Sequence, residues 1–180
     1  MTKITIFGLP GTGTSTLGKL LAKELGYEFK STGNMFREVA ANHGMTMEQF
    51  DEEITKSKTY KYDLELDESV AKYGEENDNF IFESRLAWNF IPDSYKIMLN
   101  CDIEEAFKRI AYRHDQDLEE TRTTTIQRMK DTQERYLDMY EGLEFPPKED
   151  KFDLVLDSTS IPPEGLVKLI LDDLKKKKLI

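Results

Sequence analysis

The sequence predicts one α/β domain over residues 1–180, with a parallel sheet that carries helices on both faces. Short β-rich segments alternate along the chain with segments of helical periodicity, and this order is typical of a parallel sheet. A glycine-rich loop lies between the first strand and the first helix. The length of 180 residues, with 38% hydrophobic and 33% charged residues, suits a single folded core.

The first half of the chain predicts two strands and three helices. Leucines recur at helical spacing up to Leu25 in the first predicted helix, and Gly26 is a suitable stop. Thr46 begins a capping-box pattern, Thr-Met-Glu-Gln, which predicts the start of the third helix. In order, we expect a strand over residues 3–7, a helix over 15–25, a strand over 27–30, a helix over 33–44 and a helix from residue 46.

The second half predicts three further strands. Runs of strand-forming residues indicate strands over 79–84, 94–100 and 152–157. Residues 102–141 are expected to be largely helical, and residues 163–178 to form a closing helix. Because open parallel sheets bind ligands beyond the carboxyl ends of their strands, we expect the functional residues in the turns that follow these strands.

The loop "GLPGTGTST", residues 8–16, indicates a phosphate site. It follows a strand and opens a helix, so its backbone N–H groups can point at phosphate oxygens. Ser15 stands where the pattern G-x-x-x-x-G-K-[ST] has a Mg²⁺-binding hydroxyl, but Thr14 replaces the lysine. Lys19 is expected to face solvent and not to substitute for that lysine. A glycine-rich turn without a ligand is the alternative. The residues predicted to bind ATP are Gly8, Gly11, Thr12, Gly13, Thr14, Ser15 and Thr16.

Charge and composition argue against several classes of partner. A net charge of −10 is unsuited to a duplex nucleic-acid surface, and the lysines at 175–178 are interpreted as the solvated end of a helix. No apolar run is long enough to span a bilayer, and the first residues do not read as a secretion leader. A single cysteine, Cys101, fits a reducing compartment. We therefore expect a cytoplasmic monomer that binds neither nucleic acid nor membrane.

The sequence also resembles a known family along almost its whole length. The similarity begins with "ITIFGLPGTGTSTLGKLLAKELGYEFKSTGNMFREVA" and continues through "YDLELDESV", "IFESRLAW", "EEAFKRIAYRH", "RMKDTQERYLDMY" and "FDLVLDST". These segments resemble the P-loop cytidylate kinases of the short archaeal type. The resemblance implies a five-stranded parallel core and transfer of the ATP γ-phosphoryl group to CMP or dCMP. It also implies a monophosphate-binding segment at about residues 32–72 and a short lid at about 113–127.

The resemblance implies roles for individual residues as well. Thr32 and Arg37 match the stretch that holds the acceptor monophosphate, and Arg85 matches a turn that also faces the acceptor. Asp63 and Asp67 match paired aspartates that shape the acceptor pocket; spaced i, i+4, they share one face if the segment is helical. The resemblance implies that arginines around the lid neutralise the transferring phosphoryl group or lie near the donor base. Arg109 is expected to bind the donor, and the catalytic residues are expected to be Arg113, Arg128 and Arg135.

Physical chemistry supports the arginines independently. Phosphoryl transfer needs positioning and positive charge, and guanidinium groups bind phosphate bidentately. Ordinary surface ion pairs are the alternative. Ser84 replaces the glycine of the family's E-G-R turn, and together with Thr14 it departs from the pattern. Three functions stay open: a cytidylate-type kinase, a silent nucleotide-binding protein, and a P-loop kinase for another small acceptor.

Overall fold

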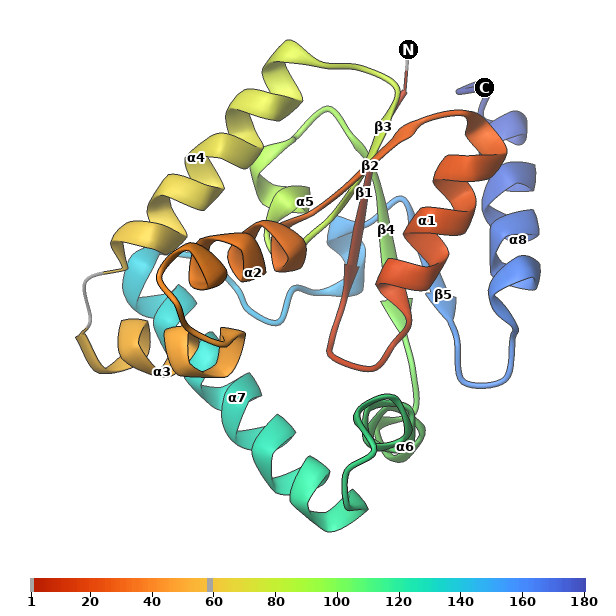
Figure 1. Ribbon diagram of the computed structural model, residues 1–180. Helices are drawn as coiled ribbons and strands as arrows, with labels where there is room; N and C mark the ends of the chain where they lie inside the picture. The colour runs from red at the N-terminus through yellow and green to blue at the C-terminus, as the bar shows by residue number, and fades with distance from the viewer. Residues whose placement is uncertain (1, 58–59) are drawn as a thin grey trace.

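A computed structural model describes residues 2–57 and 60–180 and confirms the predicted α/β fold (Figure 1). Within these residues one five-stranded sheet has the order β2-β3-β1-β4-β5, and every neighbouring pair is parallel. The strands are β1 (Lys3–Gly8), β2 (Glu28–Ser31), β3 (Phe80–Glu83), β4 (Tyr95–Asn100) and β5 (Leu154–Asp157).

Helices cover both faces of the sheet. On one face α1 and α8 bury Leu21 and Ile170 against Ile6 of β1. On the other, α4 and α5 bury Val70 and Ala87 with Phe82 of β3. Each fully buried large aliphatic or aromatic side chain contributes about 1.5–3 kcal/mol. The helices are α1 (Thr14–Leu25), α2 (Thr32–Asn42), α3 (Met47–Ser57), α4 (Lys61–Glu76), α5 (Ala87–Phe90), α6 (Ile103–His114), α7 (Leu118–Met139) and α8 (Pro163–Lys176).

Helix boundaries follow local sequence signals. The capping box that begins α3 is confirmed: the Thr46 N–H donates to the Gln49 side chain at 2.9 Å, and the Gln49 N–H donates to Thr46 Oγ1 at 3.2 Å. Asp102 caps α6 by accepting from the Glu105 N–H at 3.0 Å. Asp117 caps α7 in the same way, by accepting from the N–H groups of residues 119 and 120.

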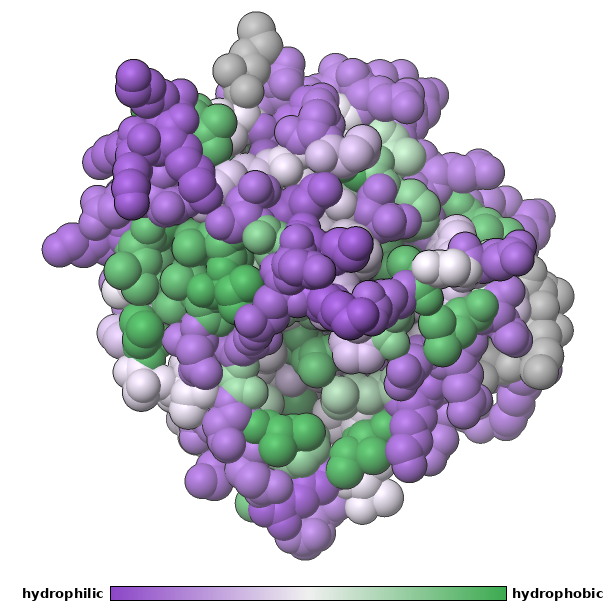
Figure 2. Space-filling model, turned by 180° about the vertical axis from the view of Figure 1, so that it is seen from behind, coloured by the Kyte–Doolittle hydropathy of each residue, from purple (hydrophilic) through white to green (hydrophobic). Residues whose placement is uncertain are grey.

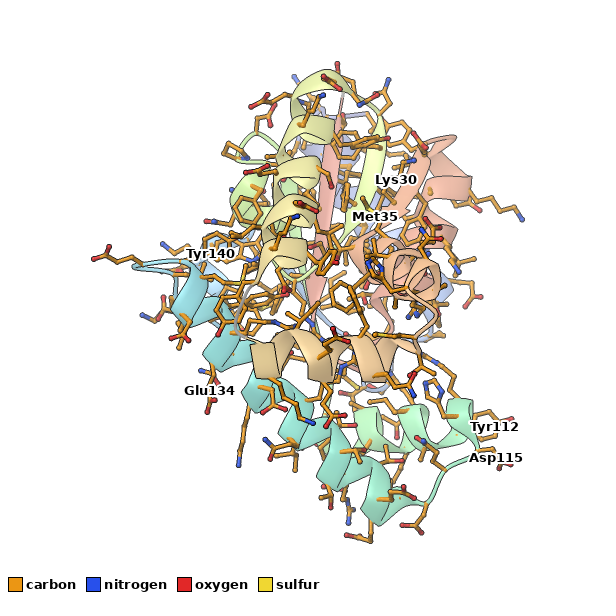
Figure 3. All side chains as sticks on the ribbon, turned by 60° about the vertical axis from the view of Figure 1, so that its left-hand side comes forward. Lys30, Met35, Tyr112, Asp115, Glu134 and Tyr140 are labelled. Atoms are coloured by element: carbon orange, nitrogen blue, oxygen red, sulfur yellow. The ribbon has the colours of Figure 1, made fainter. Side chains whose placement is uncertain are left out.

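Some element boundaries differ from those expected. The helical region expected over 102–141 is two helices, because Asp115 adopts a left-handed backbone (φ 53°) at the turn between α6 and α7. This turn, marked by Asp115 in Figure 3, points away from the sheet. The expected closing helix ends at Lys176, and α4 and the short α5 were not predicted.

The surface is largely polar. Seen from behind, hydrophilic side chains cover most of it and apolar side chains form separate patches (Figure 2). In the described part of the chain, no helix combines the length and the apolar character needed to cross a bilayer.

The strand register brings several turns together at one edge of the sheet. Glu83, the last residue of β3, is level with Ile6 of β1 on one side and with Ser31 of β2 on the other. Gly8, at the end of β1, is level with Leu99 of β4. Helices α6 and α7 lie beyond this edge (Figure 1). The carboxyl ends of the strands therefore meet where the sequence predicts the functional residues.

Candidate active site

The phosphate loop between β1 and α1 has the backbone that its glycines predict. Gly11 and Gly13 have φ angles of 84° and 93°, a left-handed region that other residues rarely adopt. A Cβ at Gly11 would also lie 2.5 Å from the carbonyl oxygen of Ala106 in α6. Gly13 begins α1 without a side-chain cap, and a Cβ there would meet no atom within 4 Å. Within the described residues, no side chain caps the first N–H groups of α1, which suits an anion.

Thr12 braces this loop. Its hydroxyl donates to the carbonyl oxygen of Leu9 at 2.8 Å, and its own carbonyl accepts from Ser158 Oγ at 2.7 Å. The Thr12 side chain is 3% exposed and does not line the cavity described below. The Thr12 side chain therefore supports the loop, and the prediction that Thr12 takes part in nucleotide binding stays a prediction. Lys19 is exposed, as predicted.

Glu83 is a site residue that the sequence reasoning missed. Its Oε1 accepts from the Thr14 hydroxyl at 2.9 Å. Its Oε2 accepts from the hydroxyls of Ser15 at 3.0 Å and Ser31 at 2.6 Å. The residue in the lysine position of the loop thus points its hydroxyl at a carboxylate on β3. The signal available in the sequence was an acidic residue at the end of a buried strand.

One cavity of about 560 Å³ joins the loop to α2, α3 and α4, within the size range of small-molecule sites. Its lining includes most of the predicted residues and omits Thr12 and Arg109. The predicted lining residues are Gly8, Gly11, Gly13, Thr14, Ser15, Thr16, Thr32, Arg37, Asp63, Asp67, Arg85, Arg113, Arg128 and Arg135.

Two buried carboxyls of α4 line the cavity. Asp63 and Asp67 of α4 are 6% and 9% exposed and share one helix face. Tyr140, which lies beside α4 in Figure 3, donates to Asp67 Oδ2 at 2.7 Å. Burial raises the pKa of both carboxyls, that of Asp67 to about 7, while the nearby Arg135 opposes the shift at Asp63. Within the described residues, Asp63 Oδ2 is buried without a hydrogen-bond partner.

Two arginines of α7 meet a carboxylate from α3. Arg135, 5% exposed, donates to Asp51 Oδ1 at 2.7 Å and lies 3.4 Å from Asp63 Oδ1. Arg128 lies 3.7 Å from Asp51 Oδ2. Asp51, which also lines the cavity, was not predicted, since an aspartate within a charged helix gives no distinct sequence signal.

The other arginines occupy three kinds of position. Arg85 donates to Thr132 of α7 at 2.9 Å, whereas Arg37 and Arg113 are exposed at the cavity rim. Arg109 lies outside the lining and donates to Ser158 Oγ at 3.1 Å and to the Ser158 carbonyl at 2.8 Å. It ties α6 to the turn after β5. Ser84 accepts from the N–H groups of residues 86 and 87, and so begins α5 beside Arg85.

Comparison with known proteins assigns the chain to a family. Residues 4–130 match the family described as AAA domain, to which the chain belongs. The cytidylate kinase of Archaeoglobus fulgidus is 33% identical over 178 residues, which cover 98% of this chain and 97% of that protein. The chain belongs to the cytidylate kinase family. The predicted resemblance to P-loop cytidylate kinases is thereby confirmed, and the chain is a member of a kinase family.

Two further proteins are similar over nearly the whole chain. The S-adenosylmethionine-dependent nucleotide dehydratase of Lacinutrix mariniflava is 32% identical over 181 residues, which cover 99% of this chain but 37% of that protein. The shikimate kinase of Aquifex aeolicus superposes with a TM-score of 0.61 at 20% identity and covers 99% of both chains. The second likeness shows a shared fold.

Proposed function

We propose that this protein transfers the γ-phosphoryl group of ATP to CMP or dCMP. The observation that carries the proposal is the single cavity in which the phosphate loop, the arginines and the two buried carboxyls of α4 face one space. A donor at the loop and an acceptor beside α4 would share that space, which is what direct transfer between two bound nucleotides requires.

The donor side fits a Mg²⁺-nucleotide. The open N–H groups at the start of α1 would bind the phosphates, since Gly13 leaves them uncapped. Ser15 and Glu83 offer the oxygen ligands that Mg²⁺ prefers, and they already lie 3.0 Å apart. When bound, Mg²⁺ neutralises charge on the phosphate oxygens. Glu83 would then exchange part of its contact with the loop hydroxyls for the ion or its water.

The acceptor side fits a monophosphate attached to an amino-bearing base. Thr32, Arg37 and Arg85 line the cavity near the start of α2 and the end of β3, and they would hold the phosphate. Asp63 Oδ2 is a buried acceptor in need of a donor. The exocyclic amino group of cytosine supplies a donor, whereas uracil presents a carbonyl oxygen at the same position. This difference favours CMP over UMP.

The reaction needs charge rather than a covalent step by the protein. A phosphate oxygen of the acceptor attacks the γ-phosphorus, the bond to the β-phosphate oxygen breaks, and ADP and CDP result. Arg113 and Arg128 line the cavity and would stabilise charge on the transferring group. Arg135, held by two carboxylates, would position α7 against the acceptor segment.

A coupled assay tests the proposal by measuring ADP formation from Mg-ATP with each ribo- and deoxyribonucleoside monophosphate, and with shikimate as a non-nucleotide acceptor. We expect the highest kcat/KM with CMP and dCMP. Asp63→Asn should narrow the preference for CMP over UMP, whereas Glu65→Gln, an exposed neighbour on α4, should leave it unchanged. Nucleotide binding without turnover of any acceptor would instead identify a silent nucleotide-binding protein.

A further inference from the structure

The side chain of Asp51 links α3 to two arginines of α7. Asp51 belongs to α3, and its side chain lines the same cavity as Arg128 and Arg135 of α7. One of its oxygens accepts from Arg135 at 2.7 Å, and the other lies 3.7 Å from Arg128. A single carboxylate therefore faces two guanidinium groups that are about two helical turns apart on α7.

The two arginines are held differently. The Arg135 side chain is 5% exposed and has Asp63 as a further counter-charge at 3.4 Å. The Arg128 side chain is 34% exposed, and its separation of 3.7 Å from Asp51 is beyond ordinary hydrogen-bond range. Breaking a long, partly exposed ion pair of this kind changes an equilibrium constant by about fivefold at most. The contact between Arg128 and Asp51 can thus be exchanged at small cost, whereas Arg135 lies against two carboxylates.

A phosphate offers a guanidinium group the same kind of oxygen acceptor as a carboxylate, with more charge. Since Asp51 and the arginines share one cavity, a phosphate that enters it competes with Asp51 for the same donors. We propose that Asp51 is a positioning residue that holds Arg128 and Arg135 before a nucleotide binds and then yields Arg128 to a phosphate of that nucleotide. The inference rests on the proposed function for the identity of that nucleotide.

The charge of Asp51 can be removed with little change of shape. Asp51→Asn keeps an oxygen that can accept from Arg135 and takes away the competing charge. Glu52→Gln is the matched control, because it removes the same charge from the next residue of α3, where Glu52 pairs with Lys56 on the surface. Calorimetry on the full chain would compare cytidine, CMP and inorganic pyrophosphate as ligands of the wild type and both variants.

We expect Asp51→Asn to bind pyrophosphate and CMP more tightly, by a factor of about 1.4 to 5, because the phosphate no longer competes with a weak ion pair. Affinity for cytidine, which has no phosphate, should stay unchanged, and Glu52→Gln should behave as the wild type. If the role of Asp51 were purely structural, Asp51→Asn would change the affinity for ligands with phosphate and for cytidine alike. Unchanged or weaker pyrophosphate binding in Asp51→Asn overturns the inference.

Thermal unfolding separates an effect of the substitution on ligand binding from its effect on fold stability. Asp51→Asn should melt below the wild type without ligand, because Arg135 has then one counter-charge fewer, yet pyrophosphate should raise its Tm by more than it raises that of the wild type. Asp51→Glu retains the charge, so its pyrophosphate affinity should stay within about twofold of the wild type; a larger rise would contradict the role assigned to charge. If wild-type CMP affinity merely equals cytidine affinity, the proposed function fails, while the pyrophosphate comparison still decides the role of Asp51.

Discussion

Thr14→Lys would restore the residue that the phosphate-loop pattern has at this position, and the structure predicts little gain in turnover. Thr14 is 8% exposed, and its hydroxyl donates to Glu83 Oε1 at 2.9 Å. A lysine side chain that starts from the same backbone position would bring its ammonium group to the same carboxylate. The new cation would therefore pair with Glu83 instead of reaching the phosphates unopposed.

The two competing energies are similar in size. One additional donor to the transition state is worth about 3 kcal/mol, so a fully effective lysine would raise kcat roughly a hundredfold. An ammonium and a carboxylate about 4 Å apart attract each other by about 4 kcal/mol at the effective dielectric near a protein surface. The substitution also removes the hydroxyl that donates to Glu83. We therefore expect less than about a tenfold increase in kcat, or a decrease.

The assay is steady-state kinetics with Mg-ATP and CMP for the wild type, Thr14→Lys and Thr14→Val. Valine keeps the shape of threonine and removes the hydroxyl, so it separates the loss of the bond to Glu83 from the addition of charge. A hundredfold rise in kcat for Thr14→Lys would refute the reasoning. The wild-type protein would then be a nucleotide-binding relative whose loop has largely stopped supporting transfer.

Three further predictions concern the acceptor side and the arginines. Arg37→Ala should raise the acceptor KM at least about tenfold with kcat nearly unchanged, because uniform binding of the monophosphate appears in KM; an unchanged KM would remove Arg37 from the site. Arg128→Ala and Arg113→Ala should each lower kcat by about 10²–10³. Arg122→Ala, which removes a pairing with surface glutamates, should change kcat little. If all three variants slowed the single-turnover rate equally, the catalytic assignment would be contradicted. Burial raises the Asp67 pKa from 3.8 to about 7, so between about pH 4 and 7 the folded state binds a proton that the unfolded state releases, and the free energy of unfolding falls as pH rises. Denaturant titrations at several pH values should show that the free energy of unfolding falls less with rising pH in Asp67→Asn than in the wild type. An equal dependence on pH in both proteins would argue against the raised pKa.

Local sequence patterns were sufficient for the sheet and the phosphate loop. The alternation of strand and helix periodicity predicts all five strands, because each pattern reports which face of its own segment is buried. The capping box at Thr46 and the glycines at positions 11 and 13 act through neighbouring backbone groups, so their consequences could be derived without the rest of the chain. The turn at Asp115 was missed because a non-glycine residue in a left-handed conformation has no strong sequence signature.

The partners of the charged residues were decided by the tertiary structure. Glu83 meets Thr14, which is 69 positions earlier in the chain, and Asp51 meets Arg135, which is 84 positions later. No periodicity within a segment encodes such pairs, because they depend on strand order and on where α7 passes α3. The sequence by itself determined the fold class, the loop and the identity of most cavity residues. Only the tertiary structure decided which carboxylate faces which hydroxyl or guanidinium group, because parallel register and helix packing bring distant segments to one edge of the sheet. Ion pairs form between groups that are a few ångströms apart in space, whatever their separation along the chain.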